Sequence, residues 1–259
     1  MNEWLQQVKD GWNETADSKW YQSLRTESAI QTIVNDPASA FHPEVIKLIK
    51  KCFSDLTDKK VLLPSSGDNH AAFAFALMGA NVTSTDISER QLANAKEVSD
   101  RLSLHIDYIC DDTMRLDRIQ SNDFDLVYTS NGTHTWINDL DSMYRNISRV
   151  LKQGGYSIMY DIHPFQRPFV GEPWIDPKIK KSYFDATAYR HWRVADLCNA
   201  MIAAGLSVTE LLELKAVNAS FWFSYADLQK QTGVEKINDW NYNPMAALPA
   251  WISIATQKL

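Results

Sequence analysis

Cysteine is scarce in this sequence of 259 residues, which contains only three. Cys52, Cys110 and Cys198 lie far apart, with no Cys-x-x-Cys pair and no grouping of cysteine and histidine at the spacing of metal ligands. Disulfide frameworks and zinc sites both show themselves through such spacing. The cysteine pattern therefore predicts a protein of a reducing compartment that binds no metal.

Long apolar runs and clusters of positive charge are lacking as well. No run approaches the roughly 18 apolar residues of a membrane span, and the N-terminal stretch MNEWLQQVKD is polar, unlike a leader. The net charge is −6 and the basic residues are scattered, so no surface for a phosphate backbone is indicated. We expect a soluble, cytoplasmic protein that binds neither membranes nor nucleic acid.

The sequence is organised around residues 61–86, VLLPSSGDNHAAFAFALMGANVTSTD, which read as strand, tight loop, helix and second strand. Parallel strands need a crossover, usually a helix, so this unit predicts the first half of a doubly wound α/β sheet. Ligands of such sheets bind beyond the carboxyl ends of the strands, here loop 64–69 and Asp86. Asp86 follows Gly67 at about the spacing of a ribose-binding carboxylate.

Glycine is sparse in the loop itself. Residues 64–69 hold one glycine, Gly67, where a dinucleotide fingerprint holds three. A phosphate cradle is therefore disfavoured, and a nicotinamide-dependent oxidoreductase becomes the weaker alternative. Gly67 has no Cβ and so lets a ligand approach the backbone closely, although an ordinary turn would explain it too.

Residues 61–69 resemble the glycine-rich first motif of class I S-adenosylmethionine-dependent methyltransferases, and Asp86 matches the acidic ribose ligand of that family. Three later runs resemble further motifs of the family in order and spacing: ICDDT (109–113), FDLVYTSN (124–131) and VLKQGG (150–155). The resemblance covers residues 59–161 well. It departs from the family pattern at three positions, where Leu63, Ser65 and Asn69 replace the usual Asp, Gly and final Gly.

The resemblance implies a Rossmann-like methyltransferase fold, with a seven-stranded, mostly parallel, doubly wound sheet, and S-adenosylmethionine as cofactor. It also implies a set of cofactor-binding residues: Tyr21, Arg25, Ser65, Gly67, Asp68, Asp86, Ile87, Asp111, Asp112, Thr113, Ser130 and Asn131. In this set Tyr21 and Arg25, four apart on a helix, would reach the carboxylate of the cofactor, and one of the two neighbouring aspartates would lie near adenine. Simple core packing explains Ile87 nearly as well.

The chain reads as one domain, residues 1–259, in four parts: an N-terminal helical cap (1–55), a cofactor-binding core (56–161), an insert (162–190) and the C-terminal part of the sheet (191–259). Ser88-Glu-Arg-Gln91 has the pattern of a capping box, which begins a helix. Gly154-Gly155 is expected to end the helix that spans about 140–151. From the resemblance, we expect the N-terminal helices to close over the cofactor cleft.

The insert is rich in proline and aromatic residues and has no clear period, which predicts an irregular loop or a short hairpin. We expect aromatic side chains to form the wall of a pocket for an apolar or aromatic acceptor: Trp136, Phe165, Phe169, Trp174 and Tyr189. Packing beneath long loops explains Trp192, Trp222 and Trp240 equally well.

Two histidines, His134 and His163, follow strands whose carboxyl ends should face the cleft, and they are the candidate catalytic bases. A base is needed only when the acceptor must lose a proton. Methyl transfer from a sulfonium otherwise requires alignment of the nucleophile with the methyl group rather than a nucleophilic side chain.

The leading hypothesis is an S-adenosylmethionine-dependent methyltransferase that acts on a small-molecule acceptor lying between the N-terminal helices, loop 130–136 and the insert. A non-catalytic protein that keeps the fold and binds the cofactor is the alternative, favoured by Leu63, Ser65 and Asn69. The sequence selects neither the acceptor nor an oligomeric state.

Overall fold

The computed structural model describes residues 3–170, 177–185, 192–223 and 234–259. The helices in this part of the chain are α1 (Glu3–Thr15), α2 (Lys19–Leu24), α3 (Glu27–Asn35), α4 (Pro43–Cys52), α5 (His70–Leu77), α6 (Glu89–Arg101), α7 (Leu140–Val150) and α8 (Val194–Ala203). The strands are β1 (Lys60–Leu63), β2 (Asn81–Asp86), β3 (Ile106–Cys110), β4 (Phe124–Ser130), β5 (Leu151–Ile162), β6 (Phe169–Val170), β7 (Lys178–Ile179), β8 (Leu206–Leu214) and β9 (Trp251–Lys258).

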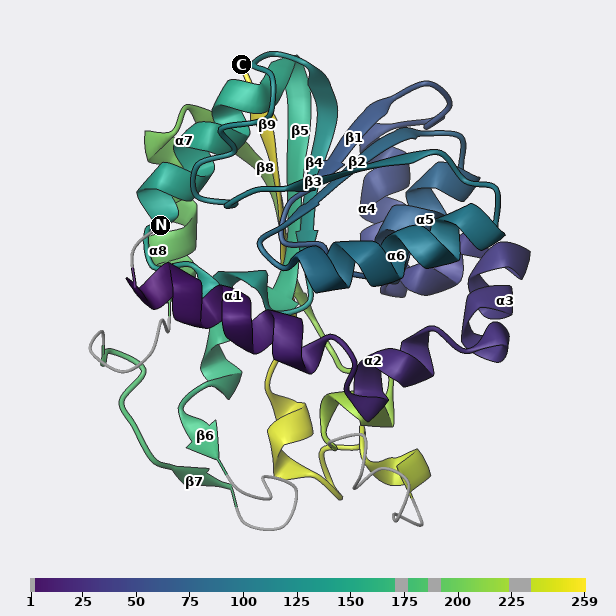
Figure 1. Ribbon diagram of the computed structural model, residues 1–259. Coiled ribbons are helices and arrows are strands. Elements are labelled where there is room, and N and C mark those ends of the chain that lie inside the picture. The colour runs from purple at the N-terminus through teal and green to yellow at the C-terminus, as the bar shows by residue number, and fades with distance from the viewer. Residues whose placement is uncertain (1–2, 171–176, 186–191, 224–233) are drawn as a thin grey trace.

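Seven strands form one sheet in the order β3-β2-β1-β4-β5-β9-β8 (Figure 1). The first five of these strands are parallel, whereas β9 runs antiparallel to both of its neighbours, β5 and β8. The strand order reverses at β1 and β4, where the helical crossovers pass from one face of the sheet to the other. The predicted seven-stranded, mostly parallel α/β sheet is therefore confirmed.

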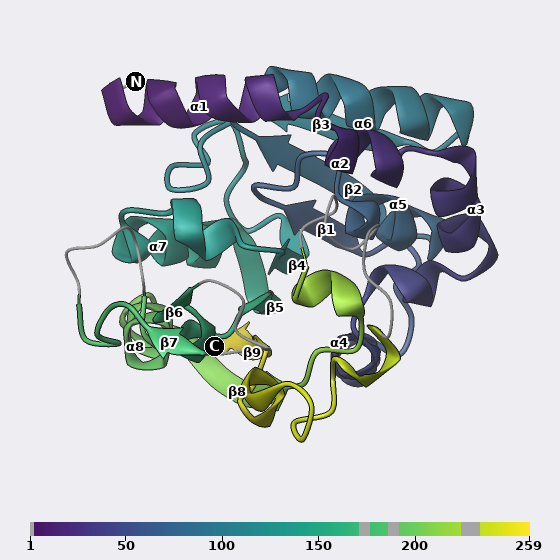
Figure 2. The same ribbon diagram turned by 90° about the horizontal axis from the view of Figure 1, so that it is seen from below.

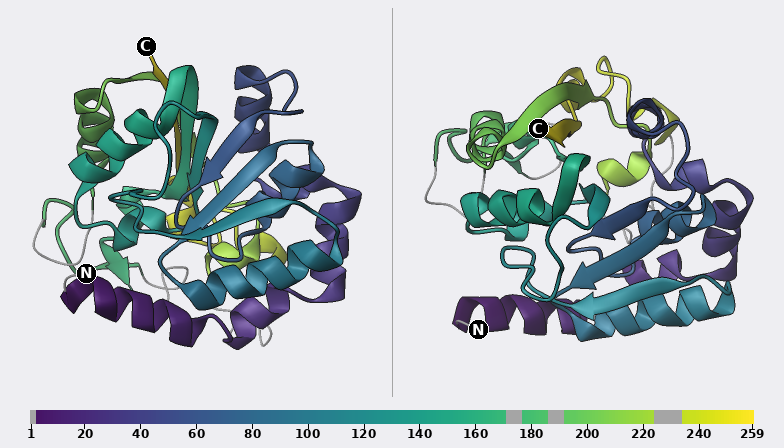
Figure 3. Two further views of the ribbon diagram at one scale, coloured as in Figure 1. Left: turned by 45° about the horizontal axis from the view of Figure 1, so that its top comes forward. Right: turned by 90° about the horizontal axis from the view of Figure 1, so that it is seen from above.

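Helices cover both faces of the sheet because its central strands are apolar on both sides. In β1, Val61 and Leu63 pack into the core beneath α3, α4, α5 and α6, whereas Leu62 points into the core beneath α7 and α8. This alternation is the period of two expected for a strand. Figures 2 and 3 show α7 and α8 on one side of the sheet and α4 and α5 on the other.

The N-terminal segment is helical, as predicted. Pro43 lies in the first turn of α4, where a backbone N–H would have no partner within the helix, so the lack of an N–H in proline costs no hydrogen bond. Helix α1 packs against α6 and lies with α2 beyond the ends of the parallel strands (Figure 1). These helices thus border the edge of the sheet at which a doubly wound fold binds its ligands.

The two glycines Gly154 and Gly155 do not end a helix, so that prediction was wrong. Helix α7 already ends at Val150, and both glycines lie within β5. They accompany a register irregularity between β4 and β5, where a Cβ on Gly155 would lie 3.1 Å from the carbonyl oxygen of Phe124. Close approach of two strands, rather than helix capping, accounts for them.

Within the insert, β6 and β7 form a short antiparallel pair, in agreement with the predicted hairpin. After β8, the chain forms short 3-10 turns that build a small core of their own around Trp222, Phe223, Ile237 and Met245. Trp222 is therefore a packing residue, one of the two roles that the sequence allowed.

Candidate active site

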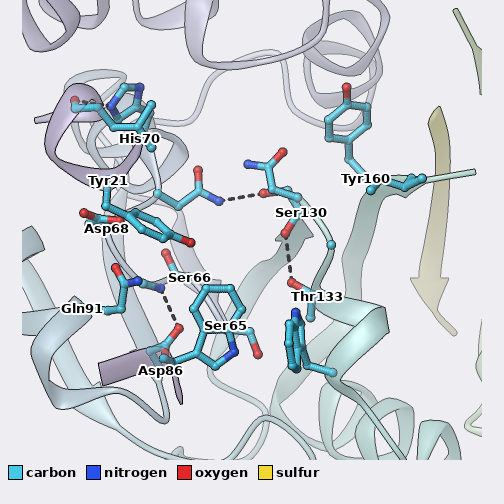
Figure 4. Close-up of a pocket in the computed structure, with 18 of the residues that line it drawn as sticks. Tyr21, Ser65, Ser66, Asp68, His70, Asp86, Gln91, Ser130, Thr133 and Tyr160 are labelled. Atoms are coloured by element: carbon cyan, nitrogen blue, oxygen red, sulfur yellow. Dashed lines mark hydrogen bonds between the residues drawn. The ribbon is translucent and has the colours of Figure 1, made fainter. Parts of the chain in front are cut away.

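A cavity of about 610 Å³ opens at the carboxyl ends of the parallel strands. Its walls come from α1 and α2, the loop 65–69, the ends of β2, β4 and β5, the first residue of β9 and residues 217–221. Figure 4 shows its two sides: Tyr21, Asp68, Asp86 and Gln91 lie on one, and Tyr160 on the other. We call the first side the polar end and the second side the aromatic end.

The loop after β1 is held in an unusual backbone conformation by its side chains. Ser65 has a φ of 50°, and its hydroxyl oxygen lies 2.6 Å from that of Thr113, at the end of β3. Asn69 accepts a hydrogen bond from the N–H of Ala71 at the start of α5 and donates one to Ser130 Oγ at 2.8 Å. The loop is thereby tied to the ends of β3 and β4.

Gly67, at the centre of the loop, has a φ of 52°, which favours glycine. A Cβ at this position would lie 3.3 Å from the side-chain oxygen of Gln91. The sequence did not single out Gln91 as a pocket residue. Gln91 was missed because the sequence assigned its side chain to a capping box. Ser88 does cap α6, but the N–H of Ser88 donates to Asp86 Oδ1 and not to the Gln91 side chain. The Gln91 side chain is therefore left to line the pocket.

Asp86 ends β2 and is 8% exposed. Each of its carboxylate oxygens accepts one backbone N–H at 2.8 Å, Oδ2 from Gly67 and Oδ1 from Ser88. Burial raises the pKa of Asp86 to about 6, although these hydrogen bonds oppose the rise. A carboxylate oxygen has room for a further donor, so a ligand hydroxyl can still bind here.

Asp68 is the second buried carboxylate of the polar end. Its Oδ2 accepts a short hydrogen bond from the guanidinium of Arg25, whereas its buried Oδ1 has no hydrogen-bond partner in the described part of the chain. Burial raises the pKa of Asp68 to about 6, and Arg25 opposes this. Burial, together with Asp68 and Asp86, raises the pKa of the neighbouring Tyr21 to about 12. Tyr21 lines the cavity, and Arg25 lies behind Asp68.

Of the two aspartates after β3, only one lines the cavity. Asp112 and Thr113 line the cavity, as does Ile87, and burial raises the pKa of Asp112. Asp111 does not line it, because its carboxylate accepts the backbone N–H groups of Asp112 and Arg118. Of the expected pair, the structure thus brings one member to the pocket.

The loop after β4 reaches the middle of the cavity, where Ser130 lies between its two ends (Figure 4). Asn131 lines the cavity as well. Asn131 has a φ of 60°, and its N–H donates to the carbonyl oxygen of Tyr160 on β5. This hydrogen bond joins the loop to the aromatic end.

The two candidate bases do not line this cavity. His134 is 4% exposed, with Nδ1 2.9 Å from Asp161 Oδ2 and Nε2 2.7 Å from the hydroxyl of Tyr144. Burial alone would raise the pKa of Asp161, but the hydrogen bonds from His134 hold it below its usual value. The ionised carboxylate thus fixes the proton on Nδ1, and the ring anchors loop 130–136 to β5.

His163 is fully buried. Its Nδ1 accepts the N–H of Phe165 and its Nε2 lies 3.0 Å from Glu213 Oε1. The expectation that these histidines face the cleft rested on their positions after β4 and β5. The structure turns both rings inward, because buried imidazoles need partners for both nitrogens.

The aromatic end is built from side chains that are far apart in the sequence. Tyr160 at the end of β5 stacks on Trp251 with a centroid distance of 4.7 Å, and Phe221 meets Trp251 edge-on at 4.9 Å. His42 lies 5.9 Å from Tyr160 on the other side. Phe41 and Trp136 also line the cavity, the latter against Trp12 of α1 at a centroid distance of 5.2 Å.

Only part of the expected aromatic wall is therefore present. Trp136 lines the cavity, whereas Phe165 and Phe169 do not. Trp174 and Tyr189 lie outside the described residues. The sequence analysis missed Tyr160, Trp251 and Phe221. Trp251 could have been found, because it is the first residue of the last strand and an antiparallel strand begins at the edge where its parallel neighbours end.

Comparisons with known proteins agree with this geometry. Residues 63–159 match the model of a family described as a methyltransferase domain. This segment runs from the last residue of β1 into β5 and includes Asp68, Asp86 and Gln91 of the polar end. The chain contains a class I S-adenosylmethionine-dependent methyltransferase domain. No curated protein sequence matches the chain.

Three solved structures show how widely the methyltransferase fold extends over the chain. An S-adenosylmethionine-dependent methyltransferase from Mesorhizobium loti is 18% identical, with a TM-score of 0.60 over 82% of this chain and 96% of the other. Geranyl diphosphate C-methyltransferase from Streptomyces coelicolor A3(2) is 13% identical, with a TM-score of 0.60 over 100% and 99%. The cyclase SpnF is 18% identical, with a TM-score of 0.58 over 83% and 80%. At these identities the likeness establishes the fold.

The polar end of the methyltransferase domain fits S-adenosylmethionine chemically. Asp68 Oδ1 and Ser66 Oγ are buried and have no hydrogen-bond partner among the described residues, so both can bond to a polar ligand. The cofactor's ammonium group and ribose hydroxyls are hydrogen-bond donors that suit the carboxylates of Asp68 and Asp86. Among the described residues, no helix is long and apolar enough to cross a bilayer, and no cluster of three side chains is arranged as metal ligands.

Proposed function

We propose that the protein transfers a methyl group from S-adenosylmethionine to a small-molecule acceptor. The observation that carries this proposal is that the polar end and the aromatic end belong to one cavity of about 610 Å³. A volume of this size suits two small molecules held side by side better than a polymer chain. The structural neighbour from Streptomyces coelicolor, a geranyl diphosphate C-methyltransferase, supports a small acceptor.

Each part of the cavity has a role in this proposal. S-adenosylmethionine, when bound, supplies a methyl group on a sulfonium, which is already a good leaving group. Asp86 would hold ribose hydroxyls, and Asp68 and Ser66 the amino acid end. Ser130 lies between this end and Tyr160, where an acceptor would meet the methyl group (Figure 4). The protein then contributes alignment and exclusion of water, which are large effects in a displacement reaction.

Calorimetric titration tests the cofactor assignment. S-adenosylmethionine and S-adenosylhomocysteine should bind with micromolar affinity, and NAD should not. Asp86→Ala should weaken the binding of both sulfur compounds by at least tenfold, because it removes the acceptor of the ribose hydroxyls. Asp107→Ala is the matched control, since Asp107 is an exposed aspartate on the neighbouring strand β3 and does not line the cavity.

Turnover needs a separate readout. Incubation with S-adenosylmethionine labelled in its methyl group and with a library of small molecules should yield a labelled product. Binding that depends on Asp86 without transfer to any acceptor would favour the non-catalytic alternative. Equal affinity of wild type and Asp86→Ala would refute the assignment of the polar end.

A further inference from the structure

The aromatic end forms a continuous row of rings, His42, Tyr160, Trp251 and Phe221, with centroid distances of 5.9, 4.7 and 4.9 Å along the row. Tyr160 is 8% exposed, and its hydroxyl has no hydrogen-bond partner in the described part of the chain. In Figure 4 its ring stands across the cavity from Asp68 and Asp86. Such a wall offers π faces and edges and one free hydroxyl to a ligand.

The row is held in place by the sheet. Trp251 is the first residue of β9 and pairs with Ile162 of β5, so its backbone is fixed by the antiparallel ladder. His42 caps α4 by accepting the N–H of Glu44 on Nδ1, and its Nε2 lies 3.2 Å from the carbonyl oxygen of Lys215. Both ring nitrogens are therefore engaged, and the ring is held in place. The wall is preorganised.

The charged side chains that line the cavity share one sign. They are all carboxylates, Asp68, Asp86 and Asp112, and no lysine or arginine appears among the described lining residues. Arg25 lies behind Asp68 and is bound to it. An anionic acceptor would thus meet carboxylates and no positively charged side chain among the described lining residues, which is unfavourable. A cation would gain from the carboxylates and from the ring faces.

Resting on the proposed function, we infer that the acceptor is a ring-bearing small molecule that is neutral or cationic, and that Trp251 is the residue that holds its ring. The carboxylates among the described lining residues disfavour phosphorylated and carboxylated acceptors. In this respect the chain differs from the neighbour whose complex contains geranyl diphosphate and Mg²⁺.

The test uses three probes with one phenyl ring and different charge: phenethylamine, 2-phenylethanol and 3-phenylpropanoate. Their affinities for the wild-type protein are measured by calorimetry at pH 7.5, with and without saturating S-adenosylhomocysteine. The amine and the alcohol should bind at least tenfold more tightly than the carboxylate. The order should be the same in both conditions, since Asp112 and the rings are present in both.

Trp251→Ala should weaken binding of the amine and the alcohol at least fivefold, and Trp251→Phe should restore most of the loss by returning a ring. Trp240→Ala is the control, because Trp240 is 62% exposed and does not line the cavity. The affinity of each variant for S-adenosylhomocysteine shows whether the variant is folded.

Three outcomes would overturn the inference: the carboxylate binds as tightly as the other probes, no probe binds, or Trp251→Ala binds them unchanged. These outcomes differ from failure of the proposed function. In that case S-adenosylhomocysteine itself does not bind, and the probe series without it still decides the chemistry of the aromatic end.

Discussion

The affinity for S-adenosylhomocysteine should rise steeply between pH 5 and pH 7. Asp68 and Asp86 both line the polar end, and burial raises the pKa of each from 3.8 to about 6. Hydroxyl and ammonium donors bond best to the ionised carboxylates. Binding therefore favours ionisation, and it must release a proton from each carboxyl group that is protonated in the free protein.

The size of the effect follows from these pKa values. A group with a pKa of about 6 is ionised in about a tenth of the molecules at pH 5 and in about nine tenths at pH 7. Each carboxylate thus contributes about tenfold to the change in dissociation constant, and the two together about a hundredfold. Burial lowers the pKa of His70, so this lining residue stays neutral at pH 7 and above.

The same shifts act on stability with a definite sign. Because the pKa of each carboxyl group is raised in the folded state, its contribution is fully present below pH 3.8 and is lost as the pH rises through about 6. The loss is about 3 kcal/mol for each group. Bound S-adenosylhomocysteine should restore part of it, so the rise in Tm on ligand addition should be larger at pH 7.5 than at pH 5.

Calorimetry in two buffers of different ionisation enthalpy counts the released protons directly. Close to two protons should be released per binding event at pH 5 and close to none at pH 7.5. Asp86→Asn should remove one of them and about tenfold of the pH dependence, whereas Asp107→Asn, on the exposed side of β3, should change neither. A dissociation constant that stays constant from pH 5 to pH 7 would refute the reasoning.

Two further predictions concern the loop after β1 and the buried His134 that anchors loop 130–136. Gly67→Ala should lower the free energy of unfolding in urea by about 1 kcal/mol, because Gly67 has a positive φ. It should also weaken the binding of S-adenosylhomocysteine, because the new Cβ contacts Gln91. Gly205→Ala is the control: Gly205 has a positive φ but no neighbour within 4 Å, so the change should lower stability without affecting binding. Tyr144→Phe should lower the free energy of unfolding, measured by chemical denaturation, by about 1–3 kcal/mol, because His134 Nε2 loses its buried hydrogen-bond partner. Tyr156→Phe, at a half-buried tyrosine, is the control and should change the free energy of unfolding little. Equal losses in the two variants would contradict the role given to the Tyr144 hydroxyl.

The fold and the polar end could be predicted from the sequence because their signals are local. Loop 64–69 and Asp86 lie within one strand-helix-strand unit, whose periodicity fixes where the strands end. The carboxyl ends of adjacent parallel strands meet at one edge, so Asp112 and Ser130 could be placed beside them without coordinates. Asp111 shows the limit of this reasoning: which of two neighbouring side chains faces the cavity depends on the hydrogen bonds of the following turn.

Apart from the place of Trp251 at the start of the last strand, the aromatic end could not be predicted, because its residues come together only through long-range pairing. Trp251 reaches Tyr160 through the β5–β9 ladder, and Phe221 reaches Trp251 through the small core after β8. Neither contact leaves a pattern in the sequence. Gln91 was missed for a different reason. Its position in a capping-box motif offered a local explanation, but the Ser88 N–H that Gln91 would have bound donates to Asp86 instead.

The departures from the family pattern at Ser65 and Asn69 are best understood together. Where glycines would give the loop freedom, this chain places side chains that bond the loop to its surroundings, Ser65 to Thr113 and Asn69 to Ser130. Leu63 is buried in the core, where a carboxylate would have to be desolvated. Ser65 and Asn69 thus make the loop less flexible and more preorganised. Gly67, Asp68 and Asp86 are still present at the polar end. They argue for a cofactor site that is rigid rather than lost, because preorganisation lowers the entropy cost of binding.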